Sequence, residues 1–83
     1  MKYYVITFEQ VHTDQGYAEY ATKGDPKTEK QATSDYYDKC SAINKDLGEN
    51  GHSFADVKVV NSTGGIIKDE KIGKYVETVE TNA

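Results

Sequence analysis

The 83-residue sequence contains no arginine and no tryptophan, and it has only one cysteine and one proline. Without arginine, the chain lacks the planar donor that makes bidentate contacts with phosphate groups and guanine. Its formal net charge of −4 at pH 7 also has the wrong sign for binding a phosphate backbone. We therefore expect that nucleic acid is not a partner of this protein.

The single cysteine, Cys40, cannot form an internal disulfide, and the sequence has no paired-cysteine metal motif. No apolar run approaches the ~20 residues that a membrane-spanning helix needs. The apolar segment at residues 3–8 is too short for a secretory signal peptide. These features predict a cytoplasmic protein without a membrane partner.

A chain of this length can support only one small core, because it buries about 60% of the surface that its unfolded form exposes. We expect a single domain over residues 1–83, ordered through residue 80 and frayed over residues 81–83. Seven tyrosines outnumber two phenylalanines among the aromatic residues. Because each tyrosine hydroxyl needs water or a hydrogen-bond partner, the core is expected to be thin.

Residues 2–11 are rich in aromatic and β-branched side chains and lack glycine and proline, which indicates a strand. Apolar residues occupy both faces of this strand, so it is expected in the centre of a sheet. The turn-forming segment HTDQG follows, and alternation resumes after it. Residues 2–24 therefore predict a β-hairpin whose register remains open.

The next segment predicts an amphipathic helix. Its start is either Asp25, with Pro26 at the first helical position, or Thr28, with Gln31 completing a capping box. A continuous apolar stripe follows at spacings of three and four residues, and Gly48 stands where a left-handed cap is expected. The stripe consists of Ala32, Tyr36, Cys40, Ile43 and Leu47.

The second half of the chain predicts another hairpin. Residues 54–61 alternate between apolar and polar side chains, and residues 66–72 form a second strand-like segment. Between them, Gly64 and Gly65 can supply the positive φ angles of a tight turn. Residues 74–80 either extend this last strand or form a short additional one.

The order ββαββ predicts an α+β fold, with a four-stranded antiparallel sheet and one helix packed on one face.

Candidate catalytic and ligand-binding motifs are few. Gly73-Lys74 matches only part of a phosphate-binding loop, and Cys40 lies on the apolar stripe of the helix, where a buried thiol is expected. His12 and His52 are expected at one end of the sheet, but two histidines of undetermined separation do not define a zinc site. We therefore expect no enzymatic activity, no cofactor and no metal.

The segments YYDKCSAINKDL, GHSFADVKVVNSTGGIIK and IGKY resemble small stand-alone proteins of gut bacteria and their phages that have no assigned activity. The resemblance extends over most of the chain, up to Tyr75, and its shared positions are turns and core residues. It implies a phage or mobile-element context, and it assigns no catalytic residue.

One helix covers only one face of a four-stranded sheet, so the first strand must leave one apolar face open. Ile6 and Phe8 are the larger apolar residues, so we expect them to face the helix together with Tyr4.

The opposite set of residues then forms an exposed protein-contact face. This set consists of Tyr3, Val5 and Val11. The predicted function is protein binding, as an adaptor or inhibitor, with a protein partner or by self-association as a weak homodimer. The alternative is a structural accessory role in a phage particle.

Overall fold

The computed structural model describes residues 1–77. It contains four strands and one helix in the predicted order ββαββ, which confirms the α+β fold class. The elements are β1 (Tyr3–Thr13), β2 (Gly16–Lys23), α1 (Glu29–Lys45), β3 (His52–Asn61) and β4 (Ile66–Gly73). The predictions that the chain is ordered through residue 80 and frayed over residues 81–83 concern positions outside the described residues.

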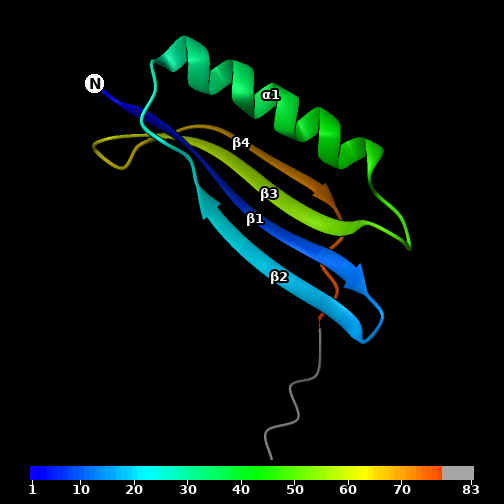
Figure 1. Cartoon of the computed structure of the whole chain (residues 1–83). Helices are drawn as coiled ribbons and strands as arrows, with labels where there is room; N and C mark the ends of the chain where they lie inside the picture. Colours follow the sequence, from blue (N-terminus) through cyan, green and yellow to red (C-terminus); the bar gives the residue numbers. More distant parts are fainter. Residues whose placement is uncertain (78–83) are drawn as a thin grey trace, which may run out of the picture.

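The four strands form one antiparallel sheet in the order β2-β1-β3-β4. The two long strands β1 and β3 are central, as expected for strands with apolar residues on both faces. Figure 1 shows α1 running across one face of this sheet, above β1, β3 and β4, with β2 beyond its reach. The contacts of α1 agree, because the helix touches β1, β3 and β4 but not β2.

The helix begins at the second of the two predicted starts. The Thr28 side chain accepts a hydrogen bond from the Gln31 backbone, and the Gln31 side chain accepts one from the Thr28 backbone, so the capping box is complete. Asp46 is the C-cap, which ends the helix before Gly48. Gly48 has a φ of 146°. Leu47, the last residue of the predicted apolar stripe, is 38% exposed, so the buried stripe ends at Ile43.

The second hairpin turns at the glycine pair. Gly64 has a φ of 89°, as predicted, but Gly65 has no positive φ. A side chain at Gly65 would instead collide with Asn61, since an added Cβ would lie 2.9 Å from its Nδ2. The Asn61 Oδ1 accepts hydrogen bonds from the backbone of Thr63 and Gly65, so this side chain holds the turn from inside.

The core lies between α1 and the central strands. The helix contributes Ala32, Tyr36, Cys40 and Ile43, whereas the sheet contributes Val5, Ala55, Val57, Val59 and Ile72. The sheet side of this core is built from small and β-branched residues. They leave room for the ring of Tyr36, which is the largest side chain that the helix buries.

The predicted faces of β1 were wrong. Val5 is 2% exposed and belongs to the core under the helix, and Tyr3 packs against that core. Tyr4, Ile6 and Phe8 lie on the opposite face instead, where the Lys23 ammonium stacks over the Tyr4 ring. The physical reason is that a helix bearing Tyr36 packs closely only on a sheet surface of small residues.

The face away from the helix has its own cover, formed by the segment after β4. The ring of Tyr75 packs against Phe8 and Phe54. The fully buried Gln10 side chain donates a hydrogen bond to the Val76 carbonyl and accepts one from the Val76 N–H, at 2.7 and 2.9 Å. The Gln10 side-chain amide thus makes the two hydrogen bonds with Val76 that the backbone of a neighbouring strand would otherwise make. Residues 74–77 themselves are not in a strand.

Candidate functional site

The surface beside α1 is uncovered where the sheet continues into β2. Residues 19–23 are all exposed, and Tyr20 is 54% exposed despite its large ring. Tyr20 pairs with Glu9, and Thr22 pairs with Thr7, so both side chains lie on the helix side of the sheet. Together with Ala18 they form a surface that we call the β2 flank.

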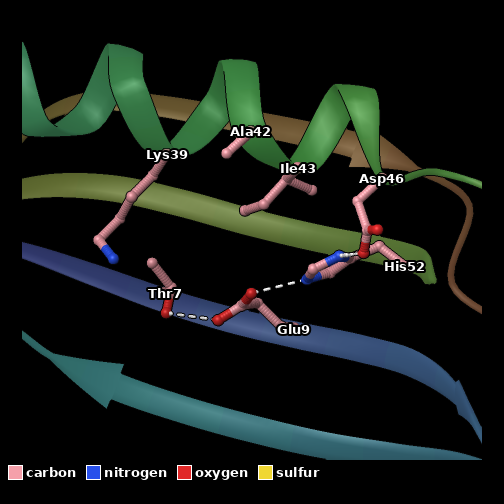
Figure 2. A pocket seen from close by; sticks show the side chains of 7 residues that line it. All are labelled: Thr7, Glu9, Lys39, Ala42, Ile43, Asp46 and His52. Carbon is pink, nitrogen blue, oxygen red and sulfur yellow. Dashed lines mark hydrogen bonds and ion pairs between the residues drawn. The ribbon is translucent and has the colours of Figure 1, made fainter.

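A pocket of about 390 Å³ lies between α1 and β1, next to the β2 flank. Strand β1 contributes Thr7 and Glu9, and the helix contributes three side chains above them. Figure 2 shows these side chains converging on the space between the two elements. The lining residues are Thr7, Glu9, Lys39, Ala42, Ile43, Asp46 and His52.

His52 forms the end wall of this pocket and bridges the helix and the sheet. Its Nε2 lies 2.7 Å from the Glu9 Oε1, and its Nδ1 lies 2.7 Å from the Asp46 Oδ2 (Figure 2). Burial alone would lower the pKa of His52, but the hydrogen bonds and charges of Glu9 and Asp46 outweigh burial and raise the pKa. Because an ionised carboxylate only accepts hydrogen bonds, both ring nitrogens must donate, and the imidazolium form fits this arrangement best.

The engagement of both ring nitrogens limits the chemistry of His52. A general base needs a free nitrogen to accept a proton, and a metal ligand needs a free lone pair. Neither is available while both carboxylates are bound. Among residues 1–77, no group of three or more histidine, cysteine, aspartate or glutamate side chains has the arrangement of a metal site.

The remaining charge in the pocket comes from Lys39. Its side chain extends from α1 toward Thr7, as Figure 2 shows. Thr7 is 1% exposed, and its hydroxyl contacts the side chains of Glu9 and Thr22. With His52 protonated, the pocket therefore has two cations, two carboxylates and a polar floor, and no residue of β2 lines it.

The structure places His12 and His52 at one end of the sheet, as the sequence predicted, but on different faces. His12 is close in the backbone, since its N–H donates to the Gly51 carbonyl at 2.8 Å. Its ring, however, stacks on Tyr17 on the face away from the helix. His12 and His52 thus lie on opposite faces of the sheet.

The other predicted positions have structural roles. Cys40 is a buried free thiol whose pKa is raised by burial, as expected for a core residue. Gly73 ends β4 with a φ of 73°, and the Lys74 N–H donates to the Ser53 carbonyl, so Gly73-Lys74 continues a hairpin. Val11 pairs with Ala18, which places it beside the β2 flank.

Sequence reasoning missed Glu9, Asp46 and Thr7 as site residues. Each is a common surface residue in its local pattern, and only the pairing of β1 with β3 brings Glu9 to His52. The spacing of Asp46 and His52 across the loop after α1 is the one local signal. It could not be interpreted without the position of β1.

Among residues 1–77, no strand pairs with the outer edge of β2, because β2 is the first strand of the sheet. The Gly24 N–H donates to the Val5 carbonyl at 2.9 Å, which fixes the alternation of hydrogen bonds along β2. The even-numbered residues bond inward to β1, and the odd-numbered residues direct their backbone groups outward. We call these outward groups the outer edge of β2; they belong to Tyr17, Glu19, Ala21 and Lys23.

Within residues 1–77, no helix has the length and apolar character that are needed to cross a membrane. Comparison with known proteins finds no family model that matches the chain, no similar curated protein and no similar solved structure. The function must therefore be inferred from the residues and their geometry.

Proposed function

We propose that this chain is a cytoplasmic, non-enzymatic protein-binding module that binds by adding a partner strand to the outer edge of β2. The observation that carries this proposal is the exposure of β2 on both its edge and its helix-side surface. An unpaired strand presents a row of N–H and C=O groups that another chain can pair with. The β2 flank lies directly beside that edge.

The side chains of β2 support this role. Tyr20 offers a large aromatic surface with a polar hydroxyl, a combination that is enriched at protein interfaces. Residues 16–23 contain no proline and no bulge, either of which would block strand addition. A partner strand can therefore reach the outer edge of β2 along its whole length.

The non-enzymatic part of the proposal follows from the titratable groups. His52 has both ring nitrogens bound to carboxylates, and Cys40 is buried with a raised pKa. Neither residue is poised to act as a base or a nucleophile. The pocket is better suited to receive a side chain of a bound partner than to carry out chemistry.

The test is a proline at Ala21. The Ala21 N–H points outward, so proline removes a donor that only a partner strand would use and leaves pairing with β1 intact. Strand addition should be lost in Ala21→Pro. The matched control is Lys71→Pro, because Lys71 also directs its N–H outward, at the other edge of the sheet.

Binding is measured by quantitative pull-down from the host with the parent and both variants, followed by amide hydrogen exchange on each complex. We expect partners that are retained by the parent and by Lys71→Pro but lost by Ala21→Pro, with protection of the Tyr17, Glu19, Ala21 and Lys23 amides. Equal binding by all three proteins would contradict the proposal. Thermal melting of each variant verifies that the fold is retained.

A further inference from the structure

The outer edge of β2 carries two charged residues of opposite sign. Glu19 and Lys23 are both exposed and lie on either side of Ala21. Antiparallel pairing of two copies about a two-fold axis at Ala21 would place Glu19 of each copy opposite Lys23 of the other. Directly opposed charges stabilise a strand pair when they differ in sign and destabilise it when they are alike.

Other two-fold registers are less favourable. An axis at Glu19 opposes two carboxylates, and an axis at Lys23 opposes two ammonium groups. An axis at Tyr20 places Glu19 opposite Ala21 and leaves the carboxylate without a directly opposed cation. The axis at Ala21 also pairs Tyr20 with Thr22 on the β2 flank, and aromatic with β-branched residues is a favourable cross-strand pair.

Both charged side chains are already oriented by contacts within the chain. The Glu19 Oε2 accepts a hydrogen bond from the Tyr75 hydroxyl at 2.7 Å, and the Lys23 Nζ lies 4.4 Å from the centre of the Tyr4 ring. These contacts hold both groups on the face away from the helix. The two charges therefore stand on one face, at the spacing that the two-fold register needs.

We propose that the strand added to β2 is β2 of a second copy, giving a symmetric homodimer with its axis at Ala21. This inference rests on the proposed function and names its partner. The two-fold axis of an antiparallel pair is perpendicular to the sheet, so the dimer is an eight-stranded sheet with both helices on the same face. The two pockets then open into one groove between the two helices, and strands β1 and β2 of both copies form the bottom of this groove.

The dimer is expected to be weak. The paired region covers only residues 19–23 of each copy. Five residues a side bury much less surface than a standard stable interface. Its dissociation constant should be micromolar or weaker. A concentration series is therefore needed to observe it.

Charge reversal tests the register. Glu19→Lys and Lys23→Glu each oppose like charges twice, and each should weaken the dimer by about tenfold, whereas the double variant Glu19→Lys/Lys23→Glu should restore it. Association is measured by sedimentation across a concentration series. Asp38→Lys is the matched control, because it changes the net charge by the same amount as Glu19→Lys on the exposed surface of α1.

A further variant, Ala21→Lys, guards against a misfolded charge variant. It places two lysines opposite each other at the axis without removing the intrachain contacts of Glu19 and Lys23. It should leave the melting temperature nearly unchanged and yield a monomer. A dimer that tolerates Ala21→Lys, or one that the double charge variant does not restore, would overturn this pairing.

The failure of this inference can be distinguished from the failure of the proposed function. A monomeric parent overturns the homodimer. If that monomeric parent still binds a foreign protein that only Ala21→Pro loses, strand addition at β2 stands with a different partner. If Ala21→Pro changes neither self-association nor foreign binding, both proposals are overturned.

Discussion

The two edges of the sheet differ in how they are protected against pairing. Strand β4 contains four consecutive charged residues, Lys68–Lys71, and its pairing with β3 has a register irregularity near its start, opposite Val59 and Val60. Helix α1 also packs against β4. Strand β2 has one acidic and one basic residue, a continuous register with β1, and no helix contact. Charges, bulges and covering elements are the usual means by which proteins block edge pairing.

Side-chain contacts strengthen the protection of β4. Lys58 on β3 contacts Asp56 and Asp69 at 2.6 and 3.3 Å, and Lys71 contacts Asp69 at 3.2 Å. A partner strand would have to align with this fixed ladder of charges. The difference between the edges indicates that only β2 is open to strand addition, which is why both proposals concern β2.

The largest expected effect separates the covered and uncovered parts of the helix side. Val5→Glu places a carboxylate in the core and should destabilise the protein by about 3 kcal/mol or more, which is enough to unfold many small domains. Tyr20→Glu changes the exposed β2 flank and should alter stability by no more than about 0.5 kcal/mol. Thermal and chemical denaturation of both variants measures this difference.

Similar losses of stability in Val5→Glu and Tyr20→Glu would mean that another part of the same chain covers the β2 flank in solution. Tolerance of Val5→Glu would show that Val5 faces solvent. Either result would remove the contrast on which the proposed binding surface depends.

A smaller effect is expected from the ionic bridge at the pocket. The pKa of His52 is raised above its ordinary value of 6.5 by Glu9 and Asp46, while Lys39 on α1 faces the same pocket. A raised pKa in the folded state adds stability that is fully present below pH 6.5 and is lost as the pH rises through the folded value. The bridge should contribute about 1 kcal/mol or less.

The pH dependence of unfolding checks this bridge. The free energy of unfolding of the parent should fall as the pH rises from below 6.5 to above the raised pKa of His52. The variant His52→Gln should lack this pH-dependent loss. His12→Gln is the matched control and should retain it, because His12 stacks on Tyr17 away from the bridge. An unchanged pH profile in His52→Gln would show that the imidazolium does not stabilise the fold.

The smallest effect concerns the protection of β4. Asp69→Thr with Lys71→Thr removes charges from the protected edge and should change monomer stability by less than about 1 kcal/mol. Made in the Ala21→Pro background, these changes should produce new weak self-association through β4. Sedimentation detects it, and Glu29→Thr with Lys30→Thr on the exposed start of α1 is the control. A strictly monomeric variant would mean that charge is not what blocks pairing at β4.

Local chemistry in the sequence was sufficient to predict the elements and several of their ends. The Thr28–Gln31 capping box starts the helix, and Gly64 supplies the positive φ of the second turn. The alternation at Ala55, Val57 and Val59 identifies the buried face of β3. Each of these signals depends on residues that are neighbours in the chain, so it can be read without knowing the fold.

The face of β1 was decided only by tertiary structure. Both faces of β1 are apolar, so its own pattern does not say whether Val5 or Ile6 meets the helix. The decision depends on Tyr36 across the core and on Tyr75, which covers the other face next to Phe8. Such contacts join residues far apart in the chain, and the size of each large ring selects the surface it can pack on.

The candidate site was decided in the same way. Glu9 meets His52 only because β1 pairs with β3 in one register, and β2 is exposed only because α1 crosses the sheet over the other three strands. The sequence by itself determined the strands, the helix and their order, since these depend on local backbone preferences and the period of the apolar residues. Register, helix placement and the exposed edge depend on how separate elements pack together, and only the tertiary structure determined them.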